Sequence, residues 1–197
     1  MYRLVVLVSG GIDSSVLLAI LTKDGIECHP LFVDYGQAAN AGEKRAALLV
    51  ASTFRWNLDV VKAPEIARLS ASSLSTGRIA DDPFFPHRNL FLITVGAMLA
   101  TRQNLDGVAI GLIKTPRYPD CSPGFVTSAR ATLQASLGHE FSLLTPLIFY
   151  DKPTIVLLGR KLGVPLDSTF SCLTLSERHC GRCESCKDRA ASLRSLA

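Results

Sequence analysis

The sequence has few of the features that mark membrane, secreted or nucleic-acid-binding proteins. Glycine, arginine or aspartate interrupts its apolar stretches well before the roughly 20 residues that cross a bilayer. Its start shows no charged segment, long apolar core and small-residue cleavage site, which predicts a cytoplasmic protein without a secretory leader. The net charge is only +4, and the lysines and arginines are scattered. We therefore expect neither a membrane partner nor a nucleic-acid partner.

The long phosphate-binding loop that ends in Gly-Lys-Ser/Thr is also missing. Instead, the apolar run Leu4-Val5-Val6-Leu7 leads into Val-Ser-Gly-Gly-Ile-Asp-Ser-Ser at residues 8–15. Two glycines let the backbone approach an anion, and a helix that starts near Asp13 directs its free N–H groups to the same point. The segment predicts a phosphate site, whereas the simpler alternative is an ordinary strand-to-helix turn with an Asp/Ser cap.

This segment resembles the SGGxDS signature of the PP-loop pyrophosphatases, which split ATP between its α and β phosphates and adenylate an acyl or carbonyl oxygen. The resemblance implies ATP and Mg²⁺ as cofactors, with Ser9, Asp13 and Ser14 as catalytic residues. Asp13 would reach Mg²⁺ directly or through water. The implied nucleotide-binding stretch consists of Val8, Ser9, Gly10, Gly11, Ile12, Asp13, Ser14, Ser15, Val16, Leu17 and Leu18.

Apolar periodicity predicts an alternation of strands and helices along the chain. The expected strands are 4–8, 29–34, 58–62, 107–111 and 140–144, and the expected helices are 14–24, 40–54, 88–101, 123–137 and 151–162. This order predicts an α/β fold, an open and mostly parallel sheet with helices on both faces, which binds ligands at the carboxyl ends of its strands. Segment 63–86 has no steady period and is predicted to be a surface excursion near the ligand.

The length of 197 residues predicts one domain, 1–197. Its last part, 167–197, is predicted to be a zinc-binding segment because it contains four of the cysteines. A cytosolic protein with six cysteines is not expected to use them as a disulfide framework. Cys28 is predicted to fill the core on the second strand, and Cys121 lies in a loop. The other four follow the spacing C-x7-C-x2-C-x2-C, at Cys172, Cys180, Cys183 and Cys186. Four thiolates predict a closed, structural Zn²⁺ site, with an iron–sulfur cluster as the alternative.

Taken together, the motifs resemble the 7-cyano-7-deazaguanine synthase (QueC) family, whose PP-loop fold is of the adenine nucleotide alpha hydrolase type. The resemblance covers essentially the whole chain. It is carried by SGGIDSS, VDYGQ at 33–37, FPHRN at 85–89, YPDC at 118–121, LTPL at 144–147, Asp151-Lys152, LGVPL at 162–166 and the cysteines. It implies an ATP-dependent C–N ligase that adenylates 7-carboxy-7-deazaguanine, forms the amide with ammonia and dehydrates it to the nitrile in a second activation. The product belongs to the queuosine and archaeosine pathways, and family members commonly form homodimers.

Residue by residue, the resemblance implies that Asp34, Tyr35, Gly36 and Gln37 line the nucleotide side. Arg88 would clamp a phosphate or carboxylate, and Lys152 would be a catalytic residue near the phosphates. The candidates for substrate binding are Arg88, Asn89, Lys114, Tyr118 and Asp120. Simpler roles remain for each group: a turn or cap residue at Asp34, a solvent-facing residue at Arg88 or Lys152, and a plain turn at Tyr118-Pro119-Asp120.

Two departures from the family pattern concern the substrate. His87 stands where the family usually has glycine before the Arg-Asn pair, and segment 111–117 is shorter and basic where the family carries an acidic loop. These changes favour, as alternatives, conjugation of a deazaguanine acid to another amine such as a protein, as is implied for divergent members in phage-defence gene clusters. A tRNA-modifying PP-loop enzyme and a non-catalytic nucleotide-binding module are further alternatives.

Overall fold

The protein is built around a five-stranded sheet in which every strand runs parallel to its neighbours. The computed structural model describes residues 2–113, 115 and 117–194. The strand order is β3-β2-β1-β4-β5, so the first strand lies at the centre. The bounds are β1 (Arg3–Leu7), β2 (Glu27–Asp34), β3 (Asp59–Lys62), β4 (Gly107–Ala109) and β5 (Ser142–Leu144). The open parallel sheet is therefore confirmed.

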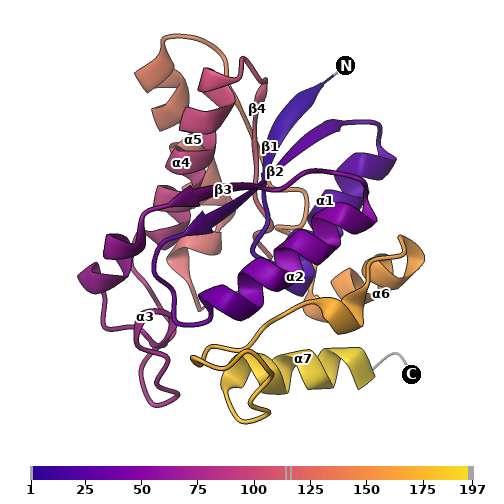
Figure 1. Ribbon diagram of the computed structural model, residues 1–197. Coiled ribbons are helices and arrows are strands. Elements are labelled where there is room, and N and C mark those ends of the chain that lie inside the picture. Colours follow the sequence, from indigo (N-terminus) through magenta and orange to yellow (C-terminus); the bar gives the residue numbers. More distant parts are fainter. Residues whose placement is uncertain (1, 114, 116, 195–197) are drawn as a thin grey trace.

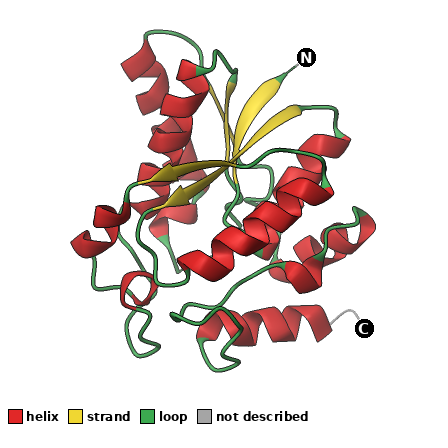
Figure 2. Ribbon diagram, in the orientation of Figure 1, coloured by secondary structure: helices red, strands yellow, loops and turns green. Residues whose placement is uncertain are grey.

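Helices cover both faces of this sheet (Figures 1 and 2). Their bounds are α1 (Ile12–Lys23), α2 (Asn40–Thr53), α3 (Ser73–Thr76), α4 (Arg88–Arg102), α5 (Pro123–Leu137), α6 (Lys152–Lys161) and α7 (Glu184–Arg194). Short 3₁₀ segments are η1 (Pro64–Leu69), η2 (Pro119–Cys121) and η3 (Leu166–Ser168). None of the helices described is long and apolar enough to cross a membrane.

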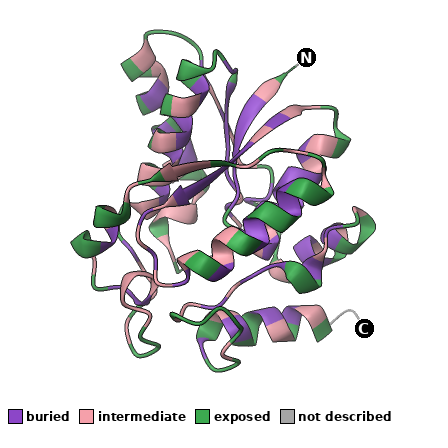
Figure 3. Ribbon diagram, viewed as in Figure 1, coloured by how far each residue is buried: buried purple, intermediate pink, exposed green. Residues whose placement is uncertain are grey.

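A core forms on each face of the sheet because the side chains of a strand alternate between the two faces. Leu4 and Val6 of β1 pack with α1, α2 and α6, whereas Val5 and Leu7 pack with α4 and α5. Each layer is buried where it meets the sheet and exposed outside (Figure 3). Cys28, at 2% exposure on β2, belongs to the first core as expected.

The differences from the predicted elements lie mainly at ends and in irregular segments. Helix α6 begins as predicted, because Asp151 caps it by accepting a hydrogen bond from the Thr154 N–H at 3.0 Å. Segment 63–86, which has no steady apolar period and was predicted to be a surface excursion, contains η1 and α3. Helix α7 was not predicted, because it overlaps the cysteine cluster and that segment was interpreted only as a metal site.

Candidate active site

The glycine-rich turn after β1 is held by close packing and by its own hydroxyl groups. Gly10 has a φ of +78°, and a Cβ there would lie 2.4 Å from the carbonyl oxygen of Glu43, so only glycine fits between β1 and α2. The Ser15 hydroxyl donates to the Gly11 carbonyl at 2.7 Å, and Ser9 Oγ lies 3.2 Å from Ser14 Oγ. The first N–H groups of α1 therefore stay at the carboxyl end of β1, where they can bind an anion.

An ion pair joins this turn to a distant part of the chain. Lys152 Nζ donates to both carboxylate oxygens of Asp13, at 2.6 and 2.7 Å, and each side chain is about one quarter exposed. Lys152 is the first residue of α6, which packs against α1. The structure thus brings two of the predicted catalytic residues into direct contact.

A cavity of about 460 Å³ opens at the carboxyl ends of the strands. The predicted site residues that line it are Val8, Ser9, Gly11, Asp13, Ser14, Tyr35, Gln37, Arg88, Asn89, Tyr118 and Lys152. Leu31, Phe32 and Val33 of β2 add an apolar wall. Its size and its mixture of apolar and polar walls suit a small organic ligand.

Several other residues predicted to bind the nucleotide instead support the fold around the turn. Ile12, Val16, Leu17 and Leu18 are buried in the core behind the turn. Asp34 accepts a hydrogen bond from the Gly36 N–H at 3.1 Å. At Gly36, φ is +86° and a Cβ would lie 2.1 Å from the Pro64 carbonyl oxygen, so this glycine is required by close approach.

A half-buried carboxyl group, which the sequence did not reveal, lies on one side of the cavity. Helix periodicity places Glu43 on the polar face of α2 with Lys44 and Arg45, yet Glu43 lines the cavity. Gln37 Nε2 donates to Glu43 Oε2 at 3.0 Å and to the Val33 carbonyl at 3.2 Å, while Gln37 Oε1 accepts from the Tyr35 N–H at 2.9 Å. Burial raises the pKa of Glu43, and the Gln37 hydrogen bond and the Arg88 charge partly oppose this increase.

Arg88 stands opposite this carboxyl group at the start of α4. Its Nη2 donates to Asn89 Oδ1 at 3.1 Å, and its charge acts on the nearby Tyr35 side chain. Burial raises the pKa of Tyr35 to about 12, although the Arg88 charge acts in the other direction. Arg88 Nε is buried and has no hydrogen-bond partner among the described residues. A buried guanidinium donor without a partner fits an anionic ligand.

His87 precedes Arg88 and has an unusual backbone conformation. His87 has a φ of +63°, in the left-handed region where glycine is favoured. Its side chain is exposed, so the imidazole is accommodated without entering the core. Histidine therefore stands at a position whose backbone favours glycine, with local backbone strain at the start of α4.

The remaining substrate candidates are Tyr118, Asp120 and Lys114. Phe84 stacks on the ring of Tyr118 with centroids 5.8 Å apart, and Arg117 lies over the same ring at 5.4 Å. Arg117 also pairs with Glu184 of α7. Asp120 lines an adjoining smaller cavity, and its carbonyl oxygen accepts from Asn89 Nδ2 at 3.2 Å. Lys114 lies outside the described residues.

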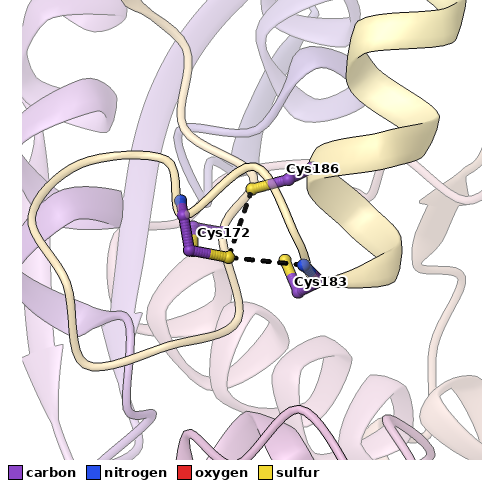
Figure 4. A group of neighbouring side chains, drawn as sticks. Cys172, Cys183 and Cys186 are labelled. Atoms are coloured by element: carbon purple, nitrogen blue, oxygen red, sulfur yellow. Dashed lines mark hydrogen bonds between the residues drawn. The ribbon is translucent and has the colours of Figure 1, made fainter.

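The four cysteines of the C-terminal segment converge, as the sequence predicts. The sulfurs of Cys172, Cys180, Cys183 and Cys186 all lie within 4.8 Å of one another. Figure 4 shows three of these side chains pointing toward one another from the loop and from the start of α7. Four thiolates at about 2.3 Å from a tetrahedral metal ion would have sulfurs about 3.8 Å apart, so the donor set fits a metal ion.

The cysteine segment also contacts the glycine-rich turn directly. The Phe170 N–H donates to the Gly10 carbonyl at 2.8 Å. The Phe170 ring stacks on His179 with centroids 4.9 Å apart and touches Gly42 of α2. Residues Glu184, Ser185 and Asp188 of α7 line the cavity, a contribution that sequence reasoning missed. The predicted metal centre therefore supports one wall of the site.

The parallel sheet, the SGGIDSS turn and the cavity beside it define a PP-loop protein of the nucleotide-binding α/β class. Solved structures share this fold: a U34-tRNA thiolase, NcsA, from Methanococcus maripaludis has a TM-score of 0.60 at 15% identity, with 98% of this chain and 65% of that chain covered. A 4-thiouridine synthetase has a TM-score of 0.57 at 14% identity, with coverage of 99% and 50%. The chain spans only about half to two thirds of those longer proteins, and the likeness shows the fold alone.

The family is shown by sequence. The model described as "Queuosine biosynthesis protein QueC" matches residues 3–197, and the chain belongs to the QueC family. A 7-cyano-7-deazaguanine synthase from Nitratiruptor sp. is 32% identical, with 95% of this chain and 91% of that protein aligned. The one from Anaeromyxobacter dehalogenans is 34% identical, with coverage of 95% and 89%. The family resemblance drawn from the motifs is thus confirmed.

Proposed function

We propose that this protein uses ATP to adenylate the carboxylate of 7-carboxy-7-deazaguanine and forms the amide when ammonia displaces AMP. A second ATP then adenylates the amide oxygen, which leaves with AMP as two protons are lost, to give 7-cyano-7-deazaguanine. The observation that carries the proposal is the cavity lined by the SGGIDSS turn, Lys152 and Arg88, in a chain of the QueC family. The name 7-cyano-7-deazaguanine synthase of the relatives supports the same product.

The first step needs an anion held beside a triphosphate. The carboxylate oxygen attacks the α-phosphorus, the bond to the bridging oxygen breaks, and pyrophosphate leaves. Gly11, Ser9 and Ser14 would bind the departing phosphates together with the α1 N-terminus, and Lys152 would neutralise part of their charge. Arg88 would hold the carboxylate with its guanidinium, whose Nε is free for this contact.

Two metal ions complete the proposal. The carboxylate oxygens of Asp13 are donors that Mg²⁺ prefers, so Asp13 would hold the cation that accompanies ATP and neutralises its phosphates. Lys152 would then exchange Asp13 for a phosphate oxygen. The four cysteines would hold Zn²⁺ in a closed shell with a structural role, because no ligand position is left for substrate.

Mass spectrometry of a reaction with the acid, ATP, Mg²⁺ and ammonium tests the proposal. We expect AMP, pyrophosphate and the nitrile. Release of AMP with an amide-linked product on an added amine or protein, and no nitrile with ammonium, would support conjugation to another amine, the alternative that His87 and the short basic segment 111–117 favour. No acid-dependent AMP would refute adenylation.

A further inference from the structure

Amide formation needs a group that accepts a proton, and the residues assigned so far supply none. The amine nitrogen attacks the carbonyl carbon of the acyl-adenylate, a C–N bond forms, and the C–O bond to AMP breaks. The nitrogen must lose a proton in this step, since ammonia enters with one hydrogen more than the amide retains. A general base within the cavity typically contributes 10²- to 10⁴-fold to such a step.

Four carboxylates line the cavity among the residues that the structure describes: Asp13, Glu43, Glu184 and Asp188. Asp13 is held through both oxygens by Lys152, and Glu184 by Arg117. Asp188 is exposed on α7. Only Glu43 combines a place at the cavity with a largely enclosed carboxyl group, in which a single oxygen, Oε2, accepts the Gln37 hydrogen bond.

The position of Glu43 relative to the reacting groups is set by two close contacts. Its own carbonyl oxygen packs against Gly10, in the turn that is proposed to hold the phosphates. Its carboxyl group interacts electrostatically with Arg88, the proposed clamp for the acid. It therefore lies between the phosphate turn and the residue that binds the carboxylate, where the acyl-adenylate must form.

We propose that Glu43 is the catalytic base of amide formation, which takes the proton from the attacking amine as AMP departs and returns it to solvent. This inference rests on the proposed function. The groups that face Glu43 agree with the role: Gln37 orients one oxygen, and Arg88 and Tyr35 are the charged and titratable neighbours. Enclosure raises the pKa of Glu43 toward the range in which a carboxylate accepts protons efficiently.

The test compares two nucleophiles in Glu43→Gln, which retains an acceptor for Gln37. Each nitrogen loses one proton as its C–N bond forms, so the two nucleophiles differ only in how far they depend on a positioned base. Hydroxylamine is mostly uncharged at neutral pH and attacks acyl-adenylates readily without one, because its nitrogen, once attached to the carbonyl carbon, is more acidic than that of ammonia. With the acid and ATP, we expect the variant to lose about 100-fold in amide plus nitrile formation from ammonia. We expect hydroxamate formation from hydroxylamine to stay within about threefold of wild type, as befits a loss confined to proton transfer. Glu43→Asp should restore part of the ammonia reaction.

The pH profile supplies a second readout. At a fixed concentration of uncharged ammonia, the wild-type rate should rise with pH through the raised pKa of Glu43 and then level off, because only the carboxylate accepts a proton. The Glu43→Gln profile should be low and flat. Glu65→Gln, an exposed glutamate that pairs with Arg68 at 2.7 Å on η1, is the matched control and should follow wild type.

The outcomes separate the two proposals. If wild type forms no hydroxamate and no AMP with the acid, the proposed function itself fails. If wild type reacts but Glu43→Gln loses both nucleophiles equally, or neither, Glu43 is not the base. Loss of ATP binding by Glu43→Gln, measured by calorimetry, would indicate a folding defect. In that case Glu43→Asp decides, and loss of both reactions in that variant also overturns the role.

Discussion

Replacing Gly42 by alanine should destabilise the protein, although the position is helical. Gly42 is the third residue of α2, and a Cβ built there lies 2.6, 2.8 and 2.8 Å from three ring carbons of Phe170. Carbon atoms pack best at about 3.5–4.0 Å, so the ring must move by about 1 Å. Phe170 is only 5% exposed and stacks on His179, which leaves little room for that movement.

The magnitude follows from two opposing effects. Overpacking of a filled core costs about 1–3 kcal/mol, whereas alanine in place of glycine gains up to about 1 kcal/mol in a helix and less in the first turn. We therefore expect the free energy of unfolding to fall by about 1–2 kcal/mol. Gly124→Ala is the control, because Gly124 is the second residue of α5 and a Cβ there meets nothing within 4 Å. This control should be stabilised by a few tenths of a kcal/mol, about the lower end of the range for such changes.

Urea unfolding followed by circular dichroism measures both variants. With a slope of about 2 kcal/mol/M, Gly42→Ala should lower the midpoint by about 0.5–1 M and leave the slope unchanged. ATP affinity should fall too, because the Phe170 N–H donates to the Gly10 carbonyl in the phosphate turn. A Gly42→Ala midpoint equal to or above that of Gly124→Ala would refute the packing argument.

Three further predictions concern the site. Lys152→Met should weaken MgATP binding by roughly 10- to 100-fold in calorimetry, since charged hydrogen bonds contribute about 1.5–3 kcal/mol; unchanged affinity would exclude a phosphate contact. Cys183→Ser should lower bound zinc below one per chain by atomic absorption and reduce Tm, whereas full metal occupancy would contradict the four-thiolate site. Burial raises the pKa of Cys121 to about 11, so its thiolate fraction and its labelling by iodoacetamide should be small at pH 8 and rise as the pH approaches 11. Rapid labelling at pH 7, by peptide mapping, would argue against that environment.

Local sequence pattern was sufficient to predict the main strands and helices. The apolar run at β1 and the helical spacing after it each depend on neighbours a few residues away, and Asp151 caps its own helix. Asp13 and Lys152 were each expected near the phosphates, but their direct contact was not predicted. Sequence spacing carries no information about which distant side chains meet. The four cysteines could be grouped because their spacing is short.

Glu43 shows why the rest could not be predicted. Its position on α2 favours the solvated face, and the same helix presents Lys44 and Arg45 beside it. What encloses its carboxyl group is the turn after β2 and the start of α4, which reach it only in the folded chain. The helix α7 is a similar case, because the neighbours that give it a place at the cavity come from segments far away in the sequence.

The ion pair between Asp13 and Lys152 spans 139 residues of chain. During synthesis, the glycine-rich turn and its aspartate leave the ribosome early, whereas the lysine emerges only when most of the protein has been made. Contacts of such long range form late, because the intervening chain must first be ordered. A nascent chain halted before α6 would carry the full signature and no complete phosphate site, so it would not retain nucleotide while still attached to the ribosome.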